Sequence, residues 1–554
     1  MPSVTLNKQV VMKLIGKKLS DERLKHAISY LGTDLESVEN NQIDVEMFPN
    51  RPDLLSEQGL ARAVSSFIGE KTGLREYPLA SSGKKVIIGK SVAPVRPYTA
   101  CAIVEGMSFD DEKIKEIIQI QEKLHITFGR NRKKAAIGIY PLEKITFPVR
   151  FVGRKPQDIR FRPLESPREM TGLQILSQHP TGREYGYLLE RHEVFPFFID
   201  ANDQVLSMPP IINSHEVGKI SEQTQDVFIE CSGHDLRVLK QCLNMIVTAM
   251  ADMGGNIKTV TVEMQNKTYT TPDLRPHEMN IEYSYVDKVL GIGTDQTTIC
   301  RLLEHMGYGI KKKNSSSLTA LIPAWRSDIL HPIDLVEDIA IAYGYDHFTP
   351  EIPQAATIAA ESPMQILQKK LADLIVGLGI TEASAFIISS SETENDRMCL
   401  EEELITLKNP STKEYDCLRP WLVPSLLDTL KLNKRHEYPQ NIFLTGRCAH
   451  ATKKQPGYKE DERIAVALCA DKVTYTDIKQ VLDTLMQQIG VSAIQVEPIV
   501  HPSFINGRAG TILAKGEEIG VIGEIDPQVL TNFELEMPVA VLEINLEKLL
   551  PLIG

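Results

Sequence analysis

Apolar residues recur at intervals of three and four in many segments of the chain, the pattern of helices that bury one face. Glycine, proline or short polar residues bound most of these segments. Proline suits the first position of a helix, so one more helix is predicted to open at Pro52 and to bury Leu60, Val64 and Phe67. The other predicted helices cover residues 20–31, 111–125, 235–253, 284–290, 296–306, 365–377, 418–431 and 477–489.

Shorter segments alternate apolar and polar residues or are continuously apolar, which is typical of strands. Pro209 and Pro210 exclude a helix and a central strand, so residues 205–214 are predicted to be extended and exposed at an edge. Residues 226–235 are predicted to form a strand ending near Glu230. The remaining strands are expected at 43–48, 86–88, 99–104, 135–139, 185–189, 318–322, 384–389, 441–444, 464–470, 511–514, 518–522 and 539–544.

The order of these elements divides the 554 residues into four regions. Paired strands with helices between them indicate an antiparallel sheet in the last region. The expected fold class is therefore an α/β multidomain protein of the α+β kind. The four regions are residues 1–80, 84–265, 270–349 and 350–554.

Composition narrows the function classes. A formal net charge of -12 argues against a bulk electrostatic binder of nucleic acid. The eight cysteines form no CxxC pair, which favours a reduced, intracellular protein. The sequence shows no signal-peptide pattern and no apolar run of membrane-spanning length. We therefore expect a cytoplasmic protein without a membrane partner. A basic cluster at Arg130, Arg132, Lys133 and Lys134 is interpreted as a solvated loop.

An acidic segment at residues 323–346 is the strongest candidate for a metal site. Asp334, Glu337 and Asp338 share one face of a helix predicted to open at Pro332, and Asp328 precedes it. Several carboxylates without His or Cys suit Mg²⁺. The alternative is a solvated helix start, where acids are favoured by the helix dipole.

A second candidate is a polar wall that joins residues 205–214 to residues 226–235. Ser207, Asn213, Glu230 and Ser232 offer hydroxyls, an amide and one acid. No GxSxG elbow and no His beside a Ser or Cys occurs there, so a nucleophile triad is not supported. From the pattern alone, structural turn residues are favoured over a pocket.

Six stretches resemble one family in their order and spacing. They are NRPDLLSEQGLAR, LHITFGRNRKKAAIGIYPLEKI, VLSMPPIINS, PAWRSDILHPIDLVEDIAIAYGYD, HPSFINGRAGTI and GVIGEIDP. Together they make the chain similar to the β subunit of phenylalanyl-tRNA synthetase, of the shorter archaeal and eukaryotic type. The resemblance implies a B1-type domain, a B3/B4 editing domain, a winged-helix-like B5 domain and a class II synthetase-like module without an active site.

The resemblance further implies a catalytic α subunit in an (αβ)₂ heterotetramer, which joins phenylalanine to tRNA(Phe) using ATP and Mg²⁺. The segment GVIGEID carries Glu524 and no arginine where a class II site needs a cation, so this module is expected not to activate an amino acid. Asp328, Asp334, Glu337 and Asp338 match the family's Mg²⁺ site, which is shared with the α subunit.

In this family the second region removes tyrosine attached by mistake to tRNA(Phe). A buried acid that accepts the tyrosine hydroxyl would be left unpaired by phenylalanine. Glu230 is the expected acceptor, with Ser207, Asn213 and Ser232 lining the pocket. The family pattern often has Asp and Thr where this chain has Glu230 and Ser232.

Three other interpretations remain open at this stage. The chain is a scaffold subunit that does not edit, a stand-alone Mg²⁺-dependent hydrolase that uses the acidic helix, or a nucleic-acid-binding protein without an enzymatic role. Activity in the absence of a partner would favour the hydrolase.

Overall fold

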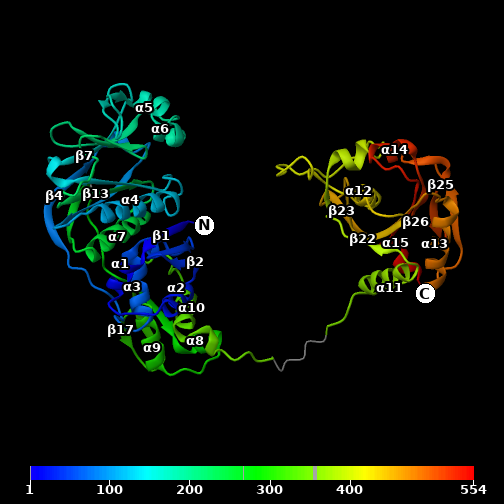
Figure 1. Ribbon diagram of the computed structural model, residues 1–554, viewed down its shortest axis with the longest axis horizontal. Coiled ribbons are helices and arrows are strands. Elements are labelled where there is room, and N and C mark those ends of the chain that lie inside the picture. Colours follow the sequence, from blue (N-terminus) through cyan, green and yellow to red (C-terminus); the bar gives the residue numbers. More distant parts are fainter. Residues whose placement is uncertain (1, 266, 353–358, 554) are drawn as a thin grey trace. The chain divides into compact units, whose positions relative to one another are not determined.

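The computed structural model describes residues 2–265, 267–352 and 359–553 (Figure 1). It separates into two compact units, Met1–Ile352 and Pro353–Gly554. None of the described helices is long and apolar enough to cross a membrane.

The first unit begins with a small antiparallel sheet in the order β1-β3-β2. The predicted helix at Pro52 is only a short 3₁₀ turn, Pro52–Leu54, and the α-helix α3 starts after Ser56, whose Oγ accepts a hydrogen bond from Gly59 N. The elements are β1 (Ser3–Asn7), α1 (Lys8–Ile15), α2 (Asp21–Tyr30), β2 (Thr33–Glu39), β3 (Gln42–Met47) and α3 (Glu57–Phe67).

A ten-stranded sheet forms most of the first unit, in the order β12-β11-β10-β7-β4-β14-β5-β13-β6, with β15 paired to β14. Its strands are β4 (Ala80–Ile88), β5 (Tyr98–Glu105), β6 (Ala135–Pro141), β7 (Val149–Arg154), β10 (Phe195–Ile199), β11 (Val205–Met208), β12 (Ile212–Asn213), β13 (Val227–Gly233), β14 (Asn256–Met264) and β15 (Lys267–Thr271). Helices α4 (Asp111–Ile126) and α7 (Leu236–Asp252) pack beside it. Strands β6 and β12 are at opposite ends of the strand order, yet Tyr140 on β6 is hydrogen-bonded to Asn213 on β12. This contact shows that the sheet is curled.

Two predictions about this sheet are wrong. Residues 185–189 are not a strand: helix α6 (Pro180–Tyr185) runs into a 3₁₀ turn at Gly186–Leu188. Pro180 starts that helix, and Gly182 packs so tightly on α5 (Gly172–Gln178) that an added Cβ would lie 1.9 Å from the Ile175 carbonyl oxygen. Strands β11 and β12 lie at an edge of the sheet as predicted, but residues 205–211 are buried rather than exposed, because the opposite end of the curled sheet lies over them.

The acidic segment belongs to a third antiparallel sheet, in the order β16-β18-β17. One hydrophobic core contains Leu60 of α3, Leu239 of α7 and Leu335 of α10, so these parts of the first unit pack as one body. The elements are β16 (His277–Glu282), α8 (Tyr283–Leu290), α9 (Gln296–His305), β17 (Gly309–Lys313), β18 (Ser317–Ile322) and α10 (Pro332–Tyr343).

The second unit contains a seven-stranded sheet in the order β19-β22-β23-β27-β26-β25-β24, antiparallel except for the first pair. Alternate residues of β23 enter two different cores, Ile464 and Val466 with α11 and α13, and Ala465 and Ala467 with α12. The strands are β19 (Thr381–Glu382), β22 (Gln440–Ala451), β23 (Tyr458–Cys469), β24 (Ile494–Pro498), β25 (Phe504–Ala514), β26 (Glu517–Ile525) and β27 (Val539–Asn545), and the α-helices are α11 (Pro363–Gly377), α12 (Val423–Asn433), α13 (Tyr475–Gln488), α14 (Pro527–Asn532) and α15 (Leu546–Leu549).

Two sequence predictions for the second unit are corrected. The helix expected at 418–431 begins only at Val423, with Pro424 in its first turn. Of the strand expected at 384–389, only β20 (Ile388–Ser389) forms, and it pairs with β21 (Cys417–Leu418).

Candidate functional site

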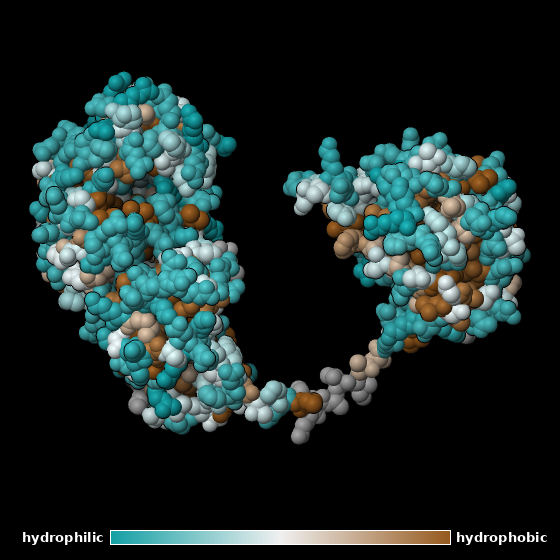
Figure 2. Space-filling model, viewed as in Figure 1, coloured by the Kyte–Doolittle hydropathy of each residue, from teal (hydrophilic) through white to brown (hydrophobic). Residues whose placement is uncertain are grey.

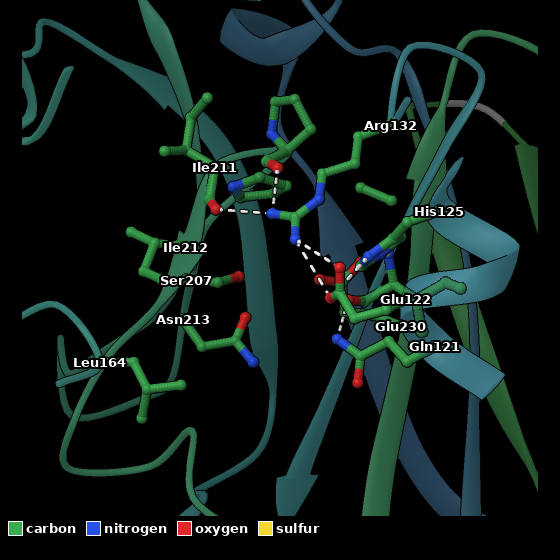
Figure 3. A pocket seen from close by; sticks show the side chains of 14 residues that line it. Gln121, Glu122, His125, Arg132, Leu164, Ser207, Ile211, Ile212, Asn213 and Glu230 are labelled. Carbon is green, nitrogen blue, oxygen red and sulfur yellow. Dashed lines mark hydrogen bonds and ion pairs between the residues drawn. The ribbon is translucent and has the colours of Figure 1, made fainter. Parts of the chain in front are cut away.

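A cavity of about 100 Å³ lies where the two ends of the curled sheet meet (Figure 3). One buried water needs about 10–15 Å³ of such space, so the cavity has room for several waters or a small chemical group. Residues from α4, from β6 and the loop before it, from β11 to β12 and from β13 line it: Gln121, Glu122, His125, Arg132, Ala136, Ile137, Leu164, Ser207, Pro209, Pro210, Ile211, Ile212, Asn213 and Glu230.

Glu230 is the acid at the floor of this cavity. Strand β13 holds it between β5 and β6, opposite Cys101 on one side and Gly138 on the other. The side chain is buried, and burial raises the pKa of Glu230 to about 8, although the charge of Arg96 opposes the rise. Tyr140 donates a hydrogen bond of 3.2 Å to Oε1, while Oε2 has no hydrogen-bond partner among the described residues. Near pH 7 Glu230 is therefore a neutral acid, able to accept through one oxygen and donate through the other.

Ser207 and Asn213 face the same cavity because they are direct neighbours in the antiparallel pair β11–β12. The buried Oγ of Ser207 makes no hydrogen bond of good geometry within the described chain. Asn213 Oδ1 accepts from the Tyr140 hydroxyl at 3.3 Å. Three of the four side chains singled out in the sequence are thus brought together.

Ser232, the fourth, does not line the cavity. Its Oγ accepts from Nε of Arg96 at 3.1 Å, and its carbonyl oxygen accepts from the same guanidinium at 2.5 Å. It therefore anchors Arg96 behind Glu230 instead of facing a ligand.

Arg132, which was predicted to lie in a solvated loop, also lines the cavity. Its guanidinium donates to the Ile211 carbonyl at 2.9 Å and to both oxygens of Glu122 at 3.1 and 3.2 Å. It also lies over the ring of Tyr185, 4.3 Å from the ring centre. The segment was among those that carried the family resemblance, but nothing in its composition indicates a buried arginine.

His125 was also missed, and its hydrogen bonds show that it is not a free base. Nε2 accepts from the Ile137 amide at 2.8 Å, so the proton is on Nδ1, which faces Glu122 at 3.2 Å. Burial lowers the pKa of His125. Burial opposes ionisation of Glu122, yet the hydrogen bond from His125 and the charge and hydrogen bonds of Arg132 lower the pKa of Glu122 below its ordinary value. The cavity thus combines a neutral acid at its floor with an ionised acid at its mouth.

Arg326 binds two of the four carboxylates of the acidic segment, Asp328 and Asp338. Arg326 donates to both oxygens of Asp328, at 2.8 and 2.7 Å, and to Asp338 at 2.9 Å. Tyr308 adds a 2.5 Å hydrogen bond to Asp338. Burial disfavours ionisation of Asp328, but the Arg326 charge holds its pKa below the ordinary value.

The other two predicted metal ligands are separate from this cluster. One oxygen of Asp334 accepts from the Leu330 and His331 amides, both at 2.7 Å, and caps the helix, while Glu337 is exposed. Among the described residues, no group of three or more His, Cys, Asp or Glu side chains is placed to hold a metal ion. The four carboxylates of this chain alone therefore do not fit a closed Mg²⁺ site.

In the second unit, the expectation that no arginine is near Glu524 is wrong. Arg508, on the neighbouring strand, is 2.6 Å from its carboxylate. The other arginines of this sheet are also paired, Arg447 with Glu460 and Glu462 and Arg463 with Asp461 and Glu543. The arginines Arg447, Arg463 and Arg508 of this sheet thus each have a carboxylate partner within the chain.

Two family models match the chain. The tRNA synthetase B5 domain matches residues 279–345, and the phenylalanyl tRNA synthetase beta chain CLM domain matches residues 349–546. These matches define the class, a protein built from tRNA synthetase domains.

Relatives over the full length define the family. The phenylalanine–tRNA ligase beta subunit of Pyrococcus furiosus is 38% identical over 556 residues, which cover 99% of this chain and 100% of the relative. The beta subunit of Methanocella arvoryzae is 35% identical over 554 residues, with 99% and 100% covered. A crystal structure of an N-terminal fragment of the phenylalanyl-tRNA synthetase beta-subunit from Pyrococcus horikoshii matches with a TM-score of 0.60 and 37% identity, over 62% of this chain and 100% of the fragment. The chain belongs to the phenylalanine–tRNA ligase beta subunit family.

Replacing Arg326 with Met should destabilise the first unit by about 3–5 kcal/mol, because two buried carboxylates lose the guanidinium that is hydrogen-bonded to both. The free energy of unfolding can be followed by Trp325 fluorescence in a Trp421→Phe background, since the chain has two tryptophans. The matched control is Arg275→Met, whose exposed pair with Asp273 should contribute less than about 1 kcal/mol. Equal effects of the two changes would contradict this account of the acidic segment.

The raised pKa of Glu230 predicts a pH-dependent stability. The folded state keeps this proton up to about pH 8, and the unfolded state releases it near an ordinary glutamate pKa, so raising the pH between these values lowers the stability. Glu230→Gln removes this dependence. The stability of the variant relative to the parent should therefore increase by about 3 kcal/mol between about pH 5 and about pH 7.5. A pH-independent difference in the same fluorescence assay would mean that Glu230 is ionised in the folded protein.

Proposed function

We propose that this chain is the non-catalytic β subunit of a phenylalanyl-tRNA synthetase. It supports the ATP- and Mg²⁺-dependent attachment of phenylalanine to tRNA(Phe) by an α subunit, in an (αβ)₂ heterotetramer, and hydrolyses tyrosyl-tRNA(Phe) in the cavity of its first unit. The observation that carries the editing part is the pair of unpartnered buried groups, Oε2 of Glu230 and Oγ of Ser207, that face one cavity.

The dependence on a partner is supported by charge pairing in the second unit. A site that activates an amino acid must offer free cations to the phosphates of ATP. Arg447, Arg463 and Arg508 are each bound to carboxylates of the same sheet.

The second unit also exposes apolar side chains that a partner could cover. Ile366, Val376 and Leu378 lie on or next to α11, each between about two fifths and three fifths exposed, and Leu432 on α12 is 70% exposed. Apolar patches interrupt the hydrophilic surface of this unit in Figure 2. Exposed apolar groups of this kind are typical of protein interfaces.

Selection of tyrosine follows from the polarity of the cavity. A tyrosyl hydroxyl can hydrogen-bond Glu230 and Ser207, whereas a phenylalanyl ring would leave both buried groups unpaired. An unpaired buried polar group costs about 1–3 kcal/mol, which corresponds to a preference of roughly 5- to 150-fold. An apolar synthetic pocket rejects an added hydroxyl only about 100-fold, so a second selection of this size is useful.

The hydrolysis itself needs a water molecule at the ester. Water attacks the carbonyl carbon, the bond to the ribose oxygen breaks, and the tRNA hydroxyl leaves with a proton. His125 cannot take up the proton because both its nitrogens are engaged. The ionised Glu122 and the Arg132 guanidinium, at the mouth of the cavity, are the charged groups available to orient that water. The four carboxylates of the acidic segment take no part in this step.

Phenylalanine-dependent exchange between ATP and pyrophosphate tests the subunit assignment. The chain alone should give no exchange, and addition of the α subunit should restore it. Exchange by the chain alone would show that the second unit is catalytic. An assembly that is inactive in both conditions would favour a scaffold or hydrolase function.

Deacylation of tyrosyl-tRNA(Phe) by the assembled enzyme tests the editing assignment. Glu230→Ala should lower the rate by at least about tenfold through loss of phenol recognition, with pyrophosphate exchange unchanged. The control is Glu116→Ala, because Glu116 is another buried acid whose pKa burial raises to about 8, in a different part of the first unit. An unchanged deacylation rate in Glu230→Ala would contradict the proposal.

A further inference from the structure

The hydroxyl of Tyr140 lies between two acceptor atoms of the residues that line the cavity. It is 3.2 Å from Oε1 of Glu230 and 3.3 Å from Oδ1 of Asn213. The side chain is fully buried, and its ring stacks on Phe228 with 6.1 Å between ring centres. Tyr140 comes from β6 and Asn213 from β12, so this hydroxyl bridges the two ends of the sheet.

We infer that Tyr140 is a positioning residue that sets the specificity of the cavity for a para-hydroxyl group by holding Glu230 in one orientation. Its hydroxyl binds Oε1 and directs the free Oε2 toward the ligand. The inference rests on the proposed editing function, which it deepens by naming the group that orients the acid.

The hydrogen bonds of Glu230 indicate which of its two carboxyl oxygens carries the proton. The Tyr140 hydroxyl has one proton, which its contacts with Oε1 and with Asn213 Oδ1 share, so it holds Oε1 as an acceptor oxygen. In the neutral acid the proton is then on Oε2, the oxygen without a partner. The ligand would accept this proton's hydrogen bond through its phenol oxygen and donate its own O–H to Ser207. Phenylalanine offers neither group.

The backbone opposite Glu230 must be glycine for this arrangement. Gly138 is the cross-strand neighbour of Glu230 on β6. A Cβ at this position would lie 2.1 Å from the Tyr140 hydroxyl oxygen and 2.6 Å from Oε1 of Glu230. Any side chain at 138 would therefore separate Tyr140 from Glu230.

The test compares four β-subunit variants in the assembled enzyme by the ratio of deacylation rates for tyrosyl-tRNA(Phe) and phenylalanyl-tRNA(Phe). Tyr140→Phe keeps the ring and removes the hydroxyl, so the ratio should fall by at least about fivefold. Because the Tyr140 hydrogen bond lowers the pKa of Glu230, its loss should also shift the pH profile of the tyrosyl reaction to higher pH. A purely structural role would not move that profile.

Tyr269→Phe is the matched control, since its hydroxyl donates to the Thr99 carbonyl oxygen, in the same sheet and outside the cavity. It should keep the ratio of the parent enzyme. Gly138→Ala is a second route to the same defect and should reproduce the loss of selectivity, which keeps the inference testable if Tyr140→Phe does not fold.

Glu230→Ala distinguishes a failure of the editing function from a failure of the role given to Tyr140. If it lowers tyrosyl deacylation while Tyr140→Phe and Gly138→Ala keep the parental ratio and pH profile, the inference about Tyr140 is overturned and the editing function stands. If Glu230→Ala itself has no effect, the proposed function fails, and the inference fails with it.

Discussion

One guanidinium, that of Arg132, joins two ends of a sheet that lie far apart in the chain. It binds the carbonyl oxygens of Pro210 and Ile211 from one end and Glu122 of α4 from the other. The three residues that deliver it, Arg130 to Arg132, all have positive φ angles, between 48° and 63°. Such backbone is unfavourable without glycine and persists where surrounding contacts fix it. Together with the hydrogen bond between Tyr140 and Asn213, this bridge holds the two walls of the cavity against each other.

In the first unit, buried guanidinium groups lie beside buried acids at both candidate sites. The effect on the acids differs between the two sites. Arg326 forms short bonds to two aspartates and holds the pKa of Asp328 below its ordinary value. Arg96 lies near Glu230 but donates its hydrogen bonds to Ser232 and to the Arg132 carbonyl oxygen, so burial determines the pKa of the acid. A similar pairing thus produces a structural ion cluster in one place and a neutral, partly unpaired acid in the other.

The sequence was informative where local rules decide the structure. Ser20 caps the predicted helix α2, Pro332 opens α10, and Glu230 lies in the predicted strand. Periodicity also indicated the mainly antiparallel sheet of the second unit.

Local rules failed where distant segments meet. The pair Pro209–Pro210 pointed to an exposed edge, but the curled sheet covers it. In the sequence Arg132 resembles an ordinary loop arginine, because its partner Ile211 lies far along the chain. The spacing of Asp334, Glu337 and Asp338 predicted a shared helix face. It could not show that Arg326 donates a hydrogen bond to Asp338.

The curl of the large sheet has a consequence for solubility. An open sheet of this size would present two edge strands with unpaired amides and carbonyls, which invite pairing with another chain. Here the β6 and β12 ends face each other across Tyr140, Asn213 and Arg132. The contacts that shape the cavity are thus the same contacts that keep these edges from a second molecule. Loosening the cavity to admit larger ligands would therefore increase the tendency of the protein to aggregate.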